Sequence, residues 1–335
     1  MHVVFIGVSH WHTSFYLEPA LALPGVRVVG VSDPDLARTH SAAAQAGCPA
    51  WADYREMCAA TRPDFAFVLG RHCDMAAAAR YLIASRIGFA IEKPAGIDTA
   101  ELRDIAARAA EAGVFAAVPL VFRLSPMLDA ITTIAAGEQV HYAGFRFIGG
   151  LTDRYREAGC DWMLRRALAG GGALINLGVH FLDLCRVLLP DGPPAVAGAI
   201  ISNATAGLEI EDHAVVLLRS GQTTGVVETG YMFPAPHSVF DLHYSIRTER
   251  HYFVVRDAET LEVIDAQRQR QVRTLATINA PLYPAFVADT FRRLSRGDPP
   301  LADLTDMAEI MQLVEHAYRA SPLRSAGQFG LSGAS

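Results

Sequence analysis

The segment Val3-Val4-Phe5-Ile6-Gly7, at the start of a 335-residue chain, decides the fold class. Its four apolar residues form a short continuous run that ends at a glycine, which is typical of a buried parallel strand. A helical stretch follows at residues 13–23 and ends at Pro24-Gly25, and a second apolar run at 27–31 ends in Ser32-Asp33. Strand, helix and strand in this order predict the beginning of a parallel sheet that is covered by helices.

The alternation of apolar runs and helical stretches continues through the first third of the chain. Three more apolar runs predict strands at residues 65–69, 89–91 and 114–118. Helical stretches lie at residues 36–46, 75–85 and 99–112. This order predicts an α/β fold with a doubly wound parallel sheet, in which ligands bind beyond the carboxyl ends of the strands. Those ends carry Gly7, Asp33, Gly70 and Lys93.

The remainder of the chain, from about residue 122, has a different pattern. After a helical stretch at 126–136, segments rich in β-branched and aromatic residues lie at 140–147, 195–202, 213–218, 223–231, 240–246 and 251–255. Gly, Pro and Asn separate these segments, which predicts an open, mostly antiparallel sheet. Two helical stretches at 285–295 and 303–320 follow. The sequence therefore predicts two domains, at residues 1–120 and 121–335, the second of the α+β type.

Composition excludes several classes of protein. The formal net charge is −6, with 51% hydrophobic and 19% charged residues. Such a chain can bury a large core, and it lacks the basic field of a general nucleic-acid binder. No unbroken apolar run reaches the roughly 20 residues that span a membrane. The start of the chain has no signal-peptide pattern, and its five cysteines form no C-x-x-C pair, so we expect a cytoplasmic protein with reduced thiols.

The turn after the first strand resembles a dinucleotide-binding turn. Its sequence is Gly7-Val8-Ser9-His10-Trp11-His12, where the usual G-x-G-x-x-G fingerprint has glycine in place of Ser9 and His12. Asp33, at the end of the second strand, would hold a ribose 2′-hydroxyl and repel a 2′-phosphate, which favours NAD over NADP. The nearby Arg38 weakens that preference. An ordinary strand–turn–helix with a solvated aspartate is the alternative interpretation.

His10 and His12 also raise the question of a metal site. Metal sites need three or four ligands, and no acidic or cysteine cluster accompanies the two histidines in the local sequence. We therefore expect no metal here. The two rings are predicted to line a cofactor or substrate pocket, or to pack in the core.

Two further motifs indicate a family. The first is Glu92-Lys93-Pro94 at the end of a predicted strand. The second is Gly170-Gly171-Gly172-Ala173-Leu174-Ile175-Asn176-Leu177-Gly178-Val179-His180-Phe181-Leu182-Asp183. Together they resemble the Gfo/Idh/MocA family of nicotinamide-dependent oxidoreductases, and the resemblance runs nearly end to end. It implies that residues 1–120 form a Rossmann domain. It also implies that residues 121–335 bind substrate and form the interface of a homodimer or homotetramer.

The resemblance implies an NAD(P)-dependent dehydrogenase acting on CH–OH groups. A hydride would pass between NAD(P) and the hydroxyl or carbonyl carbon of a sugar, polyol or related small molecule. Lys93, at a strand end, would hold the reacting oxygen, and His180 would be the general base. On one α-helix, Asn176, His180 and Asp183 would share a face. Asp183 would anchor that helix.

The predicted site residues fall into three sets. Those expected at the reacting atoms are Lys93, Asn176 and His180. Those expected to hold the cofactor are Gly7, Ser9, His10, Trp11, His12, Asp33, Gly70, Glu92 and Lys93. Those expected to contact the substrate are Lys93, Arg123, Trp162, Asn176 and His180. A helix-packing tryptophan and a solvated arginine are the alternatives for Trp162 and Arg123.

Some departures from the family pattern leave other functions open. Asn176 stands where the family commonly has aspartate, so His180 loses one source of raised basicity. Met75 stands where a family histidine is usual. The alternative function is a non-catalytic NAD(P)-binding regulatory or sensor protein that kept the fold. A third possible function is the reduction of a conjugated or imine substrate, or lyase-like chemistry through a transient oxidation.

Overall fold

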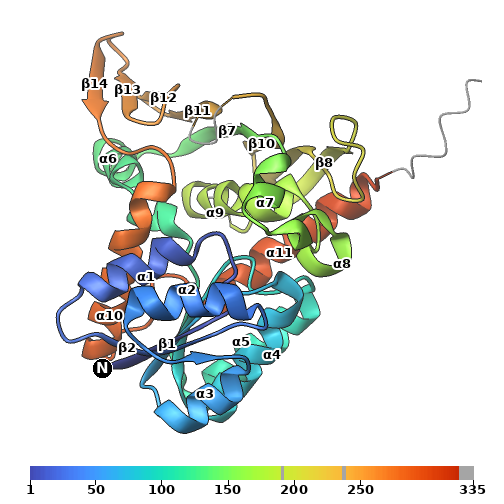
Figure 1. The fold of residues 1–335 in the computed structure, drawn as a ribbon. Coiled ribbons are helices and arrows are strands. Elements are labelled where there is room, and N and C mark those ends of the chain that lie inside the picture. Colours follow the sequence, from blue (N-terminus) through green and yellow to red (C-terminus); the bar gives the residue numbers. More distant parts are fainter. Residues whose placement is uncertain (190–191, 236–238, 324–335) are drawn as a thin grey trace, which may run out of the picture.

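The computed structural model describes residues 1–189, 192–235 and 239–323. Two separate sheets organise the chain (Figure 1). Sheet A lies among the helices of the first third of the chain, and sheet B lies across the other end of the molecule.

Sheet A is fully parallel, as the sequence predicts. Its spatial order is β3 (Ala50–Trp51), β2 (Arg27–Ser32), β1 (His2–Ile6), β4 (Phe65–Val68), β5 (Gly88–Ile91) and β6 (Ala116–Ala117). The strand order reverses between β1 and β4, and a crevice at such a switch point is where doubly wound folds bind ligands. The α/β prediction is confirmed, and Gly7, Asp33, Gly70 and Lys93 all follow strands of this sheet.

Five helices surround sheet A. They are α1 (Thr13–Ala22), α2 (Leu36–Ala46), α3 (Tyr54–Thr61), α4 (His72–Ala84) and α5 (Thr99–Ala112). Helices α2 and α5 have the predicted limits, and the side chains of Asp35 and Asp98 cap their first turns. Strand β3 and helix α3 were not predicted, because they are short and weakly patterned. Helix α4 begins earlier than predicted, which places His72 in its first turn.

Sheet B is mixed and mostly antiparallel. Its order is β14 (Arg270–Thr274), β13 (Thr260–Ile264), β12 (Tyr252–Val255), β11 (Asp241–Thr248), β7 (Val140–Gly150), β10 (Thr223–Phe233), β9 (His213–Ser220) and β8 (Ala195–Ser202). Only β7 and β10 pair in parallel among these described strands. The prediction of an open, mostly antiparallel sheet is confirmed. It omitted β13 and β14, and all five residues of β14 are exposed, so β14 has no buried face to give an alternating pattern.

One side of sheet B packs on the helices that carry the second motif. The described chain after residue 120 contains the helices η1 (Val121–Leu124), α6 (Pro126–Ile134), α7 (Asp153–Glu157), η2 (Asp161–Leu164), α8 (Arg166–Ala169), η3 (Leu174–Gly178), α9 (Val179–Leu188), η4 (Ala280–Leu282), α10 (Tyr283–Arg296) and α11 (Leu304–Ala320). The Phe181 ring of α9 lies 5.6 Å from Phe145 and 5.3 Å from Tyr244, between ring centroids.

One helical stretch of the described chain, Arg166–Leu188, is long and apolar enough to cross a membrane by length and composition. In its most apolar window, 89% of the residues are buried inside the protein. The apolar character of this stretch is therefore accounted for by its contacts in the core.

The end of the chain returns to sheet A. Helix α10 packs against α1, and α11 packs against α5. A β-bridge joins Ala117 to Asp303, and the Val118 N–H donates to Ala302 O at 3.0 Å. The first and last parts of the sequence therefore share one core. The predicted limits of the two domains, 1–120 and 121–335, stay a prediction.

Candidate active site

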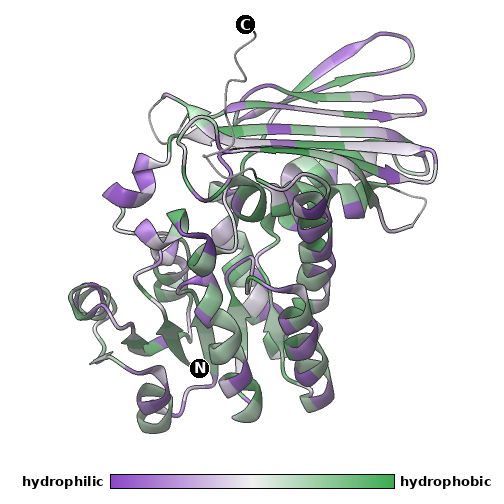
Figure 2. Ribbon diagram, turned by 90° about the vertical axis from the view of Figure 1, so that its right-hand side faces the viewer, coloured by the Kyte–Doolittle hydropathy of each residue, from purple (hydrophilic) through white to green (hydrophobic). Residues whose placement is uncertain are grey.

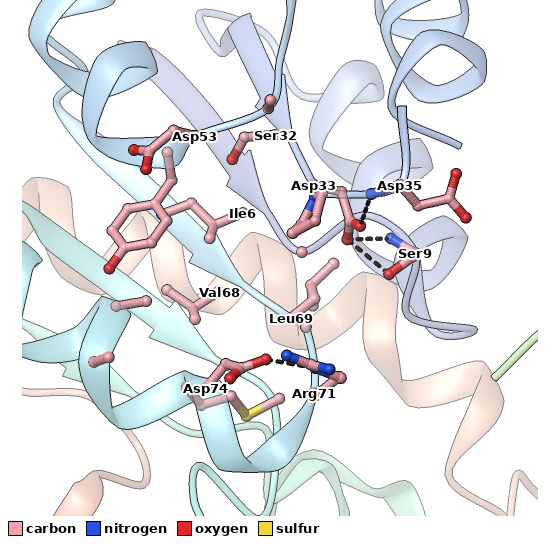
Figure 3. Close-up of a pocket in the computed structure, with 18 of the residues that line it drawn as sticks. Ile6, Ser9, Ser32, Asp33, Asp35, Asp53, Val68, Leu69, Arg71 and Asp74 are labelled. Atoms are coloured by element: carbon pink, nitrogen blue, oxygen red, sulfur yellow. Dashed lines mark hydrogen bonds and ion pairs between the residues drawn. The ribbon is translucent and has the colours of Figure 1, made fainter. Parts of the chain in front are cut away.

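A cavity of about 550 Å³ lies at the carboxyl ends of β1, β2 and β4 (Figure 3). Four residues of the predicted cofactor set line it, namely Gly7, Ser9, Asp33 and Gly70. Trp162, from the predicted substrate set, lines it as well. The cavity therefore occupies the switch point where the sequence predicts a dinucleotide.

Glycine is required at position 7 by two independent constraints. Its φ is +79°, in the left-handed region, and a Cβ there would lie 2.2 Å from the Gly70 nitrogen. The Gly70 N–H donates to Gly7 O at 3.0 Å, so the ends of β1 and β4 touch through backbone alone. His12, at the third glycine position of the fingerprint, has φ −85° and accommodates a side chain. The single retained glycine is therefore the one that the turn geometry requires.

Asp33 shapes the turn as well as the cavity wall. One of its carboxylate oxygens accepts from Ser9 N at 2.9 Å and from Ser9 Oγ at 2.7 Å, and the other accepts from Asp35 N at 2.8 Å (Figure 3). The His12 N–H donates to His10 Nδ1 at 3.1 Å. These bonds explain how a turn with Ser9 and His12 in place of glycines is held in shape.

The charges around the cavity favour a ligand without a 2′-phosphate. The lining includes four carboxylates and two guanidinium groups, those of Asp33, Asp35, Asp53, Asp74, Arg55 and Arg71. Arg71 pairs with Asp74 at 2.6 Å (Figure 3). Arg38 donates to Ser9 O at 3.0 Å and to Ala158 O at 2.5 Å, which joins the turn to the segment after α7. Arg38 is thereby engaged with backbone oxygens of two segments.

Lys93 is the centre of a second, fully buried group of residues. Its side chain is 2% exposed, and Nζ donates to the Asn176 backbone oxygen at 2.8 Å and to Asn176 Oδ1 at 2.7 Å. The nearest carboxylate oxygen, Glu92 Oε1, is 3.8 Å from Nζ. Burial lowers the pKa of Lys93 to about 8, against the opposing effect of Glu92. Lys93 is the only lysine in the sequence.

His180 lies in the same buried group with both ring nitrogens unpartnered among the described residues. Its ring centroid is 5.8 Å from that of Phe122. Burial, and then the Lys93 charge, hold the pKa of His180 well below its usual value. The imidazole is therefore neutral at pH 7 and has a free lone pair, which is what a proton acceptor requires.

The helix that carries Asn176 is not a regular α-helix. Residues Leu174–Gly178 form a π-helical turn, and α-helix begins at Val179. The prediction of one continuous α-helix is wrong at this point. Turns of this kind occur frequently at functional sites. The backbone oxygen of Asn176, within the turn, accepts from Lys93.

Two tyrosines and an arginine, none of them predicted, complete the surroundings of Asn176. Its Nδ2 donates to Tyr155 Oη at 2.7 Å and to Tyr231 Oη at 2.8 Å. Tyr155 Oη also accepts from Arg154 Nη2 at 2.8 Å. Tyr231 Oη donates to Gly172 O at 3.1 Å. Asn176 and Tyr155 thus connect Lys93 to Arg154 through hydrogen bonds.

The imidazole rings of His10 and His12, in the turn after β1, form a cluster with His72 and Trp162. The His10 centroid is 5.6 Å from Trp162 and 6.4 Å from His72. His12 Nδ1 is 3.3 Å from Glu92 Oε1. Burial holds the pKa values of His10 and His12 well below their usual range, and it lowers that of His72 to about 4. The cluster is therefore uncharged at neutral pH.

Trp11 and Glu92, both predicted to hold the cofactor, lie at the edge of the same group. The Trp11 ring centroid is 3.9 Å from that of His12 and 5.8 Å from that of Tyr155. Glu92 accepts a hydrogen bond from Tyr16. The structure thus brings the turn and the Glu92-Lys93 strand end together, and direct cofactor contacts of these residues stay a prediction.

Arg123 has a different place from the predicted one. It donates to Asp183 at 3.0 and 2.6 Å, to Asp306 at 2.9 and 2.9 Å, and to Leu301 O at 3.0 Å. These bonds occupy the full set of guanidinium N–H donors, so none is left for a substrate. Arg123 instead joins η1, α9 and α11. Asp183 anchors α9 through this arginine, in the role that the family resemblance implies.

Four residues around the buried centre carry little signal of function in the sequence, namely His72, Arg154, Tyr155 and Tyr231. His72 belongs to a segment that departs from the family pattern, and only the observed start of α4 at this residue places it against Trp162. Arg154 and Tyr155 belong to a short charged segment that is typical of a solvated surface. Tyr231 ends a strand segment with no mark of function. Each reaches the site through contacts between distant segments, which no local pattern encodes.

Two models of one family match the chain. The model described as the oxidoreductase family, NAD-binding Rossmann fold, matches residues 1–119. The model described as the GFO/IDH/MocA C-terminal domain matches residues 140–254. The two matches cover most of both sheets.

A similar curated protein is trans-1,2-dihydrobenzene-1,2-diol dehydrogenase of Oryctolagus cuniculus. It is 28% identical over 197 residues, which are 58% of this chain and 57% of that protein. The chain therefore matches little more than half the length of this relative.

Solved structures share the whole fold. GenD2 from gentamicin A biosynthesis, in complex with NAD, is 23% identical with a TM-score of 0.81 over 96% of this chain and 94% of GenD2. Levoglucosan dehydrogenase, in complex with NADH and levoglucosan, is 15% identical with a TM-score of 0.81 over 96% of this chain and 98% of that enzyme.

Proposed function

Because the chain belongs to the GFO/IDH/MocA family of oxidoreductases, with an NAD-binding Rossmann domain, we propose that it is an NAD-dependent dehydrogenase of a hydroxylated small molecule. The hydroxyl group of a sugar, polyol or related compound would be oxidised, or the corresponding carbonyl reduced. The diol and sugar dehydrogenases among its relatives support this class of substrate.

The observation that carries the proposal is the state of Lys93 and His180. Two N–H groups of the Lys93 ammonium are engaged by Asn176. The nearest carboxylate for the third is Glu92 Oε1, 3.8 Å from Nζ, and this long contact can be replaced by an oxygen atom of a ligand. His180 is buried with no described partner for either ring nitrogen. Buried polar groups are normally hydrogen-bonded, so the unpartnered nitrogens of His180, within electrostatic reach of Lys93, indicate a ligand site.

The residues at this centre have separable roles. The free Lys93 N–H holds the reacting oxygen and stabilises negative charge that develops on it. A ring nitrogen of His180 takes the hydroxyl proton during oxidation and returns it during reduction. Asn176 fixes the Lys93 ammonium without adding charge. When bound, NAD supplies the acceptor for the hydride that leaves the carbinol carbon.

The residues of the cavity fit NAD. Gly7 and Gly70 keep the crevice open at the backbone level, and Asp33 lies at the end of β2, where a ribose hydroxyl is expected. The net negative lining disfavours NADP.

The test is NADH formation with a panel of sugars, polyols and cyclic diols. Purified enzyme with NAD should form NADH with at least one of them, and Lys93→Met should abolish that reaction at saturating NAD. If NAD binds and no member of the panel is oxidised, the result favours the regulatory or sensor alternative. If Lys93→Met leaves turnover unchanged, the catalytic assignment is refuted.

We also propose that the open side of sheet B forms a homodimer or homotetramer interface. Figure 2 shows helices on one side of this sheet only. On the adjacent strands β8 and β9, Ile200 is 66% exposed and Leu217 is 45% exposed. Neighbouring large apolar side chains on an uncovered sheet face are typical of a protein–protein interface. Sedimentation velocity should show a dimer or tetramer, and Leu217→Glu should yield monomer. A monomeric wild-type protein would refute this interface.

A cytoplasmic location is the remaining proposal. All five cysteines are free, and burial raises the pKa of Cys185, which keeps that thiol unreactive. Free thiols suit a reducing compartment. Fractionation of the source cells, with the chain detected by antibody, tests the location, and recovery in a secreted fraction would contradict it.

A further inference from the structure

Arg154 is a buried cation without a described counter-ion. It is 9% exposed, and none of the carboxylates in the described part of the chain forms an ion pair with it. Its Nε is buried with no hydrogen-bond partner, and Nη2 donates to a neutral acceptor, Tyr155 Oη. The other charged groups on α7 differ, since Arg156 is half exposed and pairs with Asp153 at 2.7 Å.

The surroundings of Arg154 are aromatic. Its guanidinium carbon is 4.8 Å from the ring centre of Tyr155, 5.1 Å from that of Tyr231 and 5.9 Å from that of Trp11. Aromatic faces stabilise a cation only in part, and they provide no acceptor for the Nε–H at the guanidinium edge. The Nε–Nη2 edge of a guanidinium can bind a planar anion, because its two N–H groups match the two oxygens of a carboxylate.

Arg154 is also close to the reacting centre. Tyr155 Oη, which accepts from Arg154, accepts from Asn176 Nδ2 as well, and Asn176 Oδ1 accepts from Lys93. Three hydrogen bonds therefore connect the two cations. The Arg154 charge contributes to the lowered pKa values of Lys93 and His12, which places it within electrostatic reach of both.

The charges around Lys93 and Arg154 also favour an anionic ligand. Lys93 and Arg154 are cationic, and Glu92 is the carboxylate that lies near Lys93. The four imidazoles of His10, His12, His72 and His180 are uncharged at neutral pH because their pKa values are lowered. Among Glu92, Lys93, Arg154 and these imidazoles one positive charge is left over, and an anionic ligand beside Arg154 would compensate it.

We propose that Arg154 binds a carboxylate of the substrate, so that the compound oxidised at Lys93 and His180 is a polyhydroxylated acid of the sugar-acid type. This inference rests on the proposed dehydrogenase function and specifies its substrate class. The carboxylate is held and not transformed, while the hydroxyl carbon loses a hydride and the hydroxyl oxygen loses a proton.

The experiment compares acids with their neutral counterparts. The probe pairs are D-glucuronate with D-glucose, and D-gluconate with D-sorbitol. Dissociation constants are measured by calorimetry on the enzyme saturated with NADH, which needs no turnover, and NADH formation is measured separately with NAD. We expect the wild-type protein to bind at least one acid about 100-fold more tightly than its neutral counterpart, as for a buried charge-assisted pair.

Three variants separate binding from folding. Arg154→Met should remove the preference for acids and raise KM more than it lowers kcat, while Arg154→Lys should restore part of the preference. Arg156→Met, two residues further along α7, is the matched control and should change nothing. Circular dichroism and the midpoint of thermal unfolding check that each variant is folded.

The outcomes distinguish failure of the Arg154 assignment from failure of the proposed dehydrogenase function. If the wild-type protein binds no acid more tightly than its neutral partner, the assignment of Arg154 is refuted, whether or not the variants fold. If Arg154→Met weakens acid and neutral ligands equally, Arg154 has a structural role only. If an acid binds with the expected preference but is never oxidised, the carboxylate site stands and the dehydrogenase proposal fails.

Discussion

Lys93 Nζ lies 2.7 Å from Asn176 Oδ1 and 2.8 Å from the backbone oxygen of the same residue. Two segments that are far apart in sequence, the end of β5 and the π-helical turn, thus meet at a single ammonium group. Because the partner is an amide, the bond fixes the position of Lys93 without supplying a negative charge. No charge on Asn176 opposes the effect of burial, which lowers the pKa of Lys93 to about 8.

The titration of Lys93 can be observed directly because the chain contains one lysine. Protein labelled with ¹³C-lysine should give a single Cε signal in NMR that titrates with a midpoint near pH 8. Below that pH the ammonium is present, so its contribution to carbonyl reduction should be lost as the pH rises through the midpoint, in addition to the decline that follows deprotonation of His180 at lower pH. A midpoint near the ordinary value of about 10.4 would contradict the buried environment of Lys93.

Two substitutions should move that midpoint in opposite directions. Glu92→Gln removes a charge that raises the pKa of Lys93, so the midpoint should fall. Asn176→Asp places a carboxylate at hydrogen-bond distance from Nζ, so the midpoint should rise. Glu111→Gln, at an exposed position of α5, is the control and should leave the signal unchanged. The NMR midpoint and the pH profile of reduction should shift together.

Arginine is not expected to support activity in place of Lys93. Its guanidinium is larger, stays charged at every accessible pH and cannot present one N–H to the substrate from the same pocket. We expect Lys93→Arg to lower kcat/KM for the hydroxylated substrate, measured at saturating NAD, by about 10³, the order of a lost oxyanion stabiliser. Arg108→Lys, the reverse change at an exposed site, should retain full activity. Retention of activity by Lys93→Arg would contradict the role assigned to the free N–H.

Asp33 should determine the choice of cofactor. Asp33→Asn removes a charge from the cavity and weakens the bonds that hold Ser9, so the dissociation constant of NAD should rise about tenfold and the preference over NADP should shrink. Fluorescence titration with NADH and NADPH measures both constants, and Asp129→Asn serves as the control. Tighter binding of NADPH than NADH by the wild-type protein would overturn this assignment.

The glycine at position 172 should be required for stability. A Cβ there would lie 1.9 Å from the Glu211 backbone oxygen, which cannot move without breaking its bond from Ala173 N. Gly172→Ala should lower the free energy of unfolding by about 3 kcal/mol, as for a severe overpacking change. Gly198→Ala, where the nearest atom is 3.9 Å from the added Cβ, is the control. Urea denaturation followed by circular dichroism gives both values.

The sequence by itself determined the fold class and the ends of the strands. Apolar runs that end at Gly7, Asp33, Gly70 and Lys93 predict a parallel sheet with a ligand crevice, because burial on both faces leaves a continuous hydrophobic signal. The two motifs around Lys93 and His180 were also legible, since each is contiguous in the chain. Strand β14 and helix α3 escaped prediction because short or exposed elements carry little periodicity.

The tertiary structure alone decided which side chains surround the reacting centre. Arg123 is conspicuous in sequence, yet its donors are consumed by Asp183, Asp306 and Leu301. Arg154 belongs to a charged segment that is typical of a surface, yet it is buried beside Tyr155 and within three hydrogen bonds of Lys93. The physical reason is that burial and partner choice depend on contacts between distant segments. Local composition determines the elements, and only their packing determines which charge is left without a partner.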